Sequence, residues 1–88
     1  MPAISMFYGV IIKMFFNDKE KHHLPHIHAE YNEYAAVFDF NANLIYGDLP
    51  LKQNKMVETW ILIHQDELKA AWKMLIDSGE YYKIDPLK

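Results

Sequence analysis

The chain has 88 residues, 51% of them apolar and 15% aromatic, which predicts one domain over residues 1–88 with one packed core layer. Cysteine is absent, which excludes disulfides, thiolate metal ligands and cysteine nucleophiles. The net charge of −3, with nine lysines and no arginine, argues against an extended nucleic-acid interface for this chain alone.

The N-terminal stretch is an apolar strand rather than a targeting or membrane segment. β-branched and aromatic residues dominate residues 5–16, which predicts one strand covered on most of both faces. Lys13 interrupts the apolar run well short of the roughly 20 residues of a membrane span, and there is neither a basic n-region nor a small-residue cleavage site. We therefore expect a cytoplasmic protein with no membrane segment.

A hairpin follows a polar loop over residues 17–25. Its strands are expected at residues 26–31 (HIHAEY) and 34–40 (YAAVFDF). A two-residue turn beginning at Asn32 joins them, since asparagine tolerates the positive φ that a type I′ turn requires. A further short strand is expected at residues 44–47.

The second half has the periodicity of helices. Apolar residues recur at spacings of three and four after Pro50, and Gly79 is placed as a helix stop. The acidic residues after His64 suit a new helix N-terminus, so a break is expected there. Residues 81–88 are expected to add a short edge strand. The sequence thus predicts an α+β fold, an antiparallel sheet of about four strands with two helical segments packed on one face.

Alternation places the hairpin's histidines on one face of the sheet. Successive strand residues point to opposite sides, so His26, His28 and Glu30 share one face and the residues between them face the core. Counting back through a two-residue turn places Asp39 opposite His26, whereas a three-residue turn would move it away. Two further histidines, His22 and His23, precede this strand in the polar loop.

Four interpretations of this face remain open. It is a solvated polar surface, as on many antiparallel sheets. It is a metal site, in which His26, His28 and Asp39 hold a divalent metal such as zinc, with Glu30 or a loop histidine as other third ligands. It is a metal-free acid–base site, in which Asp39 orients His26. Or it binds a partner and changes charge near neutral pH.

Lys13 bears on the same question. In a single strand it would share a side with Phe7, Ile11 and Phe15. If that side is the histidine side, the lysine would pair with the carboxylates or bind an anion. The sequence contains no nucleophile elbow, phosphate-binding glycine loop, dinucleotide fingerprint or HExxH pattern. Whether the chain forms homo-oligomers stays open.

The segments ISMFYGVIIKMFFND, LPHIHAEYNEYAAVFDF, GDLPLKQNKMVETWILIHQDELKAAWKML and KIDPL occur in this order. Together they resemble a family of small bacterial proteins called domain of unknown function 4160. The residues that carry its Pro-His-x-His-Ala and Tyr-x-x-Tyr pattern are Pro25, His26, His28, Ala29, Tyr31 and Tyr34. Position 13 is more often arginine in that family, and lysine makes a bidentate anion contact less well.

The resemblance implies that the protein is encoded beside a second small protein, in a pair expected to behave as a toxin–antitoxin module. We therefore expect a cytoplasmic bacterial protein that acts with a small co-encoded partner through its histidine-rich strand face. The alternative is a metal-dependent hydrolase or nuclease, and a third hypothesis is a pure interaction module. The functional side chains expected on this face are His26, His28, Glu30 and Asp39.

Overall fold

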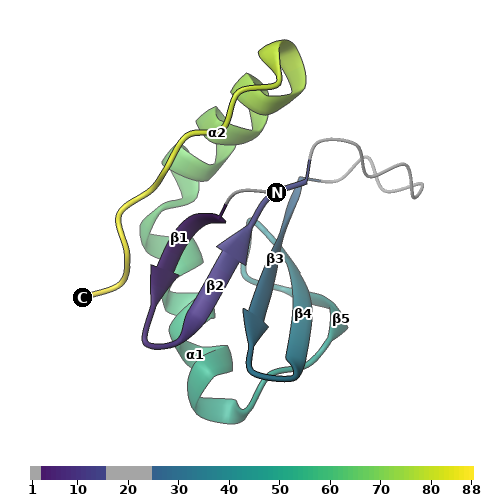
Figure 1. Ribbon diagram of the computed structural model, residues 1–88, viewed down its shortest axis with the longest axis vertical. Helices are drawn as coiled ribbons and strands as arrows, with labels where there is room; N and C mark the ends of the chain where they lie inside the picture. The colour runs from purple at the N-terminus through teal and green to yellow at the C-terminus, as the bar shows by residue number, and fades with distance from the viewer. Residues whose placement is uncertain (1–2, 16–24) are drawn as a thin grey trace.

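The computed structural model describes residues 3–15 and 25–88. Five strands form one antiparallel sheet whose spatial order follows the sequence, and two helices cover one of its faces (Figure 1). The expected α+β class is therefore confirmed. In order, the elements are β1 (Ala3–Phe7), β2 (Val10–Lys13), β3 (His26–Tyr31), β4 (Tyr34–Asp39), β5 (Leu44–Gly47), α1 (Leu51–Ile63) and α2 (Gln65–Ser78).

The strand count differs from the expected four because the single strand expected over residues 5–16 is a hairpin. Tyr8 and Gly9 adopt positive φ values of 49° and 82°, and Phe7 pairs with Val10 across the turn. Two successive positive φ values are the geometry of a type I′ turn. The strand therefore reverses, and Phe7 lies in the core, on the opposite face from Lys13.

One hydrophobic core fills the space between the sheet and the helices, and within it Trp60 and Phe38 are completely buried. In β2 and β4 every second side chain is turned toward the helices, as expected of a one-sided sheet. In β1 a register shift between Ala3 and Ser5 interrupts the alternation, so Ile4 and Phe7 both lie in the core. Among residues 3–15 and 25–88, neither helix combines the length and the apolar character that crossing a membrane requires. The strand residues of the core are Ile4, Phe7, Val10, Ile12, Ile27, Ala29, Ala36 and Phe38.

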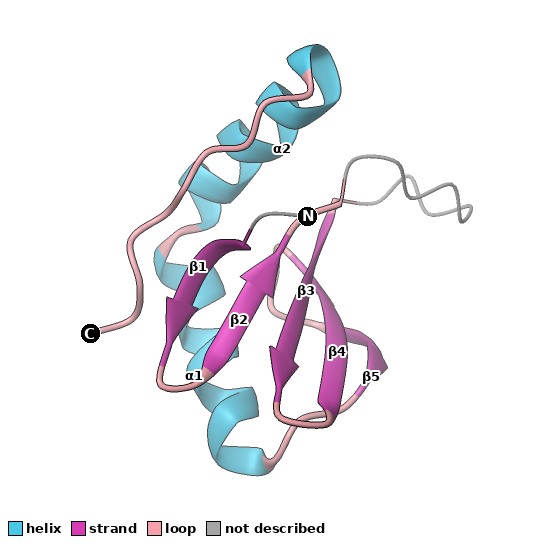
Figure 2. Cartoon of the chain, viewed as in Figure 1, coloured by secondary structure: helices cyan, strands magenta, loops and turns pink. Residues whose placement is uncertain are grey.

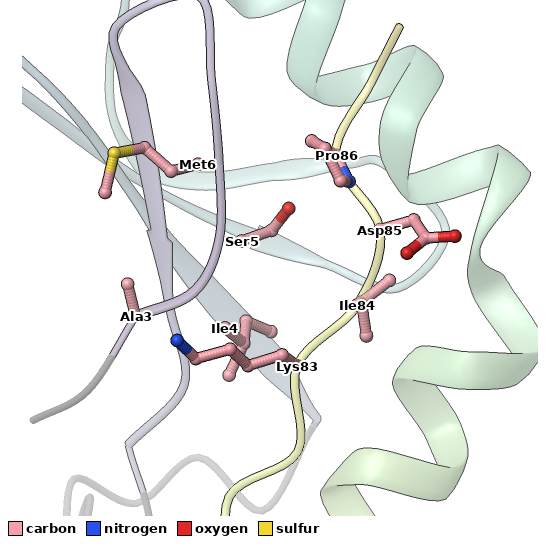
Figure 3. A pocket seen from close by; sticks show the side chains of 8 residues that line it. All are labelled: Ala3, Ile4, Ser5, Met6, Lys83, Ile84, Asp85 and Pro86. Carbon is pink, nitrogen blue, oxygen red and sulfur yellow. The ribbon is translucent and has the colours of Figure 1, made fainter.

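The helical half ends in an extended tail, as the change from helix to loop in Figure 2 shows. The expected break occurs at His64, and the expected stop at Gly79 has a left-handed φ of 73°. The tail is not a regular strand, which corrects the expectation for residues 81–88. It lies along β1, where the N–H of Ile84 donates to the Ile4 carbonyl (2.9 Å), across a groove of about 330 Å³ (Figure 3).

Gly47, at the end of β5, and Gly79, after α2, have similar positive φ values but different surroundings. A Cβ on Gly47 (φ 77°) would overlap the Ala35 carbonyl, whereas a Cβ on Gly79 (φ 73°) meets nothing. Gly79→Ala should lower the free energy of unfolding by about 1 kcal/mol through φ strain alone. Gly47→Ala should cost at least about 2 kcal/mol, because the steric clash adds to this strain. Urea denaturation of both variants measures the difference, and equal losses would contradict the packing at Gly47.

Candidate functional site

The β3–β4 hairpin holds the histidine stretch in the expected register. His26 pairs with Asp39 and Tyr31 with Tyr34, so the turn contains two residues. Asn32 has the positive φ (52°) that the sequence predicted for it. The geometric premise of the site, that His26 and Asp39 stand opposite one another on neighbouring strands, is therefore confirmed.

The sheet face turned away from the helices is the candidate site, and we call it the open face. Lys13 of β2 stands opposite His28 of β3, and Ile11 stands opposite Glu30. These side chains are partly exposed, whereas their chain neighbours Ile12 and Ala29 are fully buried. The open face includes Ile11, Lys13, Phe15, His28, Glu30 and Val37.

Lys13 of β2 and Glu30 of β3 form an ion pair across neighbouring strands. The lysine Nζ lies 3.2 Å from Oε1 and 3.4 Å from Oε2 of the carboxylate, and both side chains are partly exposed. A pair in this setting adds only about 0–1 kcal/mol to stability. Its main effect is on the electrostatics of the open face, because each charge is neutralised by the other beside His28.

His26 does not share the open, solvated position expected for it. Its residue is only 2% exposed, and its ring centroid lies 5.4 Å from that of Trp72 and 5.3 Å from that of His28. The cause is long-range packing, since α2 continues past the end of the sheet at which β3 begins (Figure 1). Trp72 therefore covers the first residue of β3, and His26 belongs to the packed interior.

The two histidines are part of a chain of five aromatic rings. Phe15 contacts His28 edge-on at 4.4 Å, and Trp72 contacts Phe40 at 6.1 Å, with His26 between the two pairs. Edge-on and tilted ring pairs at these separations are favourable contacts. The chain connects the open face to the helical layer around the end of β3. Sequence reasoning had no local signal for Trp72 in this role.

Asp39 is committed to the turn that follows β4. Its Oδ1 accepts hydrogen bonds from the backbone N–H groups of Asn41 and Asn43, both at 2.9 Å, and its Oδ2 accepts one from the Asn43 side chain at 3.1 Å. Partial burial acts to raise the pKa of Asp39, but the hydrogen bonds from Asn43 and Asn41 outweigh it and hold the pKa below its usual value. This carboxylate is thus ionised at neutral pH and anchors a turn.

The two carboxylates expected to act with the histidines therefore contact other groups instead. Glu30 pairs with Lys13, and Asp39 holds its turn. Within residues 3–15 and 25–88, no three histidine, aspartate or glutamate side chains are grouped closely enough to hold a metal ion. Metal binding by His26, His28 and Asp39 stays a prediction. The loop histidines, His22 and His23, lie outside the described residues.

Comparison with known proteins places this architecture within one family model. The model described as "Domain of unknown function (DUF4160)" matches residues 9–73 of the 88. The matched span runs from the β1–β2 turn into α2, so it contains the whole open face and Trp72. No curated protein and no solved structure matches the chain.

The two histidines should differ in what they contribute to stability. His26→Ala leaves a cavity beside Trp72 and should lower the free energy of unfolding by about 2–3 kcal/mol. His28→Ala removes a partly exposed ring and should cost about 1 kcal/mol. Chemical denaturation followed by tryptophan fluorescence measures both values. A larger loss for His28→Ala would contradict the burial of His26 against α2.

The hydrogen bonds of Asp39 make a pH-dependent contribution to stability. A lowered folded-state pKa gives stabilisation that is present above the unfolded pKa and is lost as the pH falls through the folded pKa. Asp39→Asn, which leaves the Asn43 amide without its acceptor, should cost about 1 kcal/mol at neutral pH. The difference in free energy of unfolding between Asp39→Asn and the unmodified protein should become smaller below about pH 4. Leu62→Gln, which changes no titratable group at a 55% exposed position of α1, is the control and should show no such narrowing.

Proposed function

Because the chain belongs to the DUF4160 family, we propose that it is one component of a toxin–antitoxin-type pair in the bacterial cytoplasm, binding a small co-encoded partner protein through its open face. The gene pairing is what the family resemblance implies. The observation that carries the proposal is a sheet face left uncovered by the helices, with a neutralised ion pair and a histidine among apolar side chains.

The composition of the open face suits protein recognition. Ile11, Phe15 and Val37 are partly exposed apolar side chains, and the charges of Lys13 and Glu30 cancel. The centres of protein interfaces are poor in unpaired charges and rich in aromatic and apolar groups. A partner that covers this face would therefore bury apolar area without isolating an unpaired charge.

His28 lies near the middle of the open face. It lies opposite Lys13 on one side and Val37 on the other, with the Phe15 ring against it. The metal-dependent hydrolase or nuclease is not favoured, because Glu30 and Asp39 are engaged in other contacts.

Partner binding should respond to a charge placed on the open face and not to one placed on the helical side. Val37→Lys adds an unpaired cation beside His28 and should weaken binding to the co-encoded protein about tenfold or more. Leu62→Lys, at a 55% exposed position of α1, should leave binding unchanged. The measurements are pull-down after co-expression and titration calorimetry with the purified partner.

Growth of cells that express each protein alone and both together tests the paired role. Expression of one member should impair growth, and co-expression should restore it. Val37→Lys should abolish the restoration, while Leu62→Lys should preserve it. Absence of binding together with absence of any growth effect would remove the proposal. A His28→Ala variant that keeps both binding and growth behaviour would reduce the protein to a pure interaction module.

A further inference from the structure

The two edges of the sheet differ in whether other parts of the chain cover them. The outer edge of β1 is covered by the tail, through the hydrogen bond from Ile84 to Ile4 and the burial of Ile84 (4% exposed). Trp60 fixes the same tail by donating its Nε1–H to the Asp85 carbonyl at 2.8 Å. β5 forms the other edge, and all four of its residues are exposed. Among residues 3–15 and 25–88, the sheet therefore has one covered and one open edge.

The open edge is apolar. Leu44, Ile45 and Tyr46 are 46%, 41% and 76% exposed, and Leu51, shortly after the strand, is 75% exposed. β5 itself contains neither a charged residue nor a proline, the residues that commonly protect an edge strand against pairing. Exposed apolar side chains gathered on an unpaired edge are typical of a surface that another strand covers.

We propose that the occupant is a second copy of this chain, paired antiparallel through β5 so that the two five-stranded sheets become one continuous sheet. This inference does not depend on the proposed function. A two-fold axis perpendicular to the sheet pairs β5 of one copy with β5 of the other. This is the simplest symmetric arrangement in which both open edges form backbone hydrogen bonds. The register follows from the faces on which the β5 residues lie.

Tyr46 lies on the side of the open face, since it stands opposite Val37, and Gly47 lies on the core side, opposite Ala36. Pairing across the axis joins residues of the same face. With Tyr46 at the axis, the two Tyr46 rings become cross-strand neighbours, a favourable aromatic pair. Ile45 then stands opposite the partner's Gly47, which carries no side chain.

The charges near β5 are compatible with this register. The nearest acidic residue along the chain, Asp48, falls opposite the partner's Leu44 rather than opposite another carboxylate. No like charges therefore oppose each other, an arrangement that would destabilise a strand pair. The ladder between β4 and β5 is shifted at Val37 and Phe38, so Ile45 is an extra, bulged residue. A bulge shortens regular pairing, so apolar contact supplies much of the dimer's stability.

The pairing has a consequence for the open face. Because the axis is perpendicular to the sheet, both copies present their open faces to the same side of the dimer. The row Lys13, His28, Val37 and Tyr46 would then continue from one copy into the other. A dimer of this form offers a doubled recognition surface with Tyr46 at its centre.

Cysteine cross-linking tests the register directly, because the chain has no native cysteine. In Tyr46→Cys the two thiols would meet at the axis, at a separation close to what a disulfide spans. Under mild oxidation this variant should form covalent dimer at least about tenfold faster than Ile76→Cys, whose position on α2 is also exposed (46%). Leu44→Cys, which is off the axis, should cross-link as slowly as Ile76→Cys.

Sedimentation of the unmodified chain gives the second measurement. It should be a concentration-dependent dimer, Ile45→Lys should be a monomer with an unchanged circular dichroism spectrum, and Ile76→Lys should remain a dimer. A wild-type chain that stays monomeric at every accessible concentration overturns the proposal, whether or not another protein binds β5. Equal cross-linking rates at positions 46 and 76 also overturn it.

Discussion

The indole of Trp60 is the contact on which the arrangement of the layers depends. It is completely buried, its ring lies 5.6 Å from Phe7 of β1 and 5.4 Å from His64 at the helix junction, and its Nε1–H is satisfied by the Asp85 carbonyl. A buried tryptophan needs both apolar surroundings and a partner for its N–H. One side chain therefore ties the sheet, the break between the helices and the tail to each other.

This one-sided packing determines what is left exposed. In the part of the chain that the structure describes, the helices and the tail cover the core face of the sheet and the β1 edge, and the open face and the β5 edge stay uncovered. The chain of rings from Phe15 to Phe40 adds a link around the end of β3. A partner that moved the Phe15 or His28 ring would also change the packing of His26 and Trp72, because these rings contact one another in series.

The parts of the fold that depend on local patterns could be predicted from the sequence. The hairpin register follows from a two-residue turn at Asn32, and the helix break and stop follow from His64 and Gly79. The β1–β2 hairpin was missed because its turn, Tyr8 and Gly9, lies inside an apolar run without polar turn residues. The burial of His26 depends on Trp72, 46 positions later, and no local pattern carries that contact.

The contacts of Glu30 and Asp39 bear on whether the open face recognises a partner or carries out a reaction. The metal and acid–base hypotheses for this face both use a carboxylate within reach of the histidines. Here Glu30 forms an ion pair with Lys13. The Asp39 carboxylate accepts three hydrogen bonds from donors in the Asn41–Asn43 turn. Redirecting either carboxylate would break contacts that the fold already uses. Covering the face with an apolar partner would break none of them, because Lys13 and Glu30 would stay paired with each other.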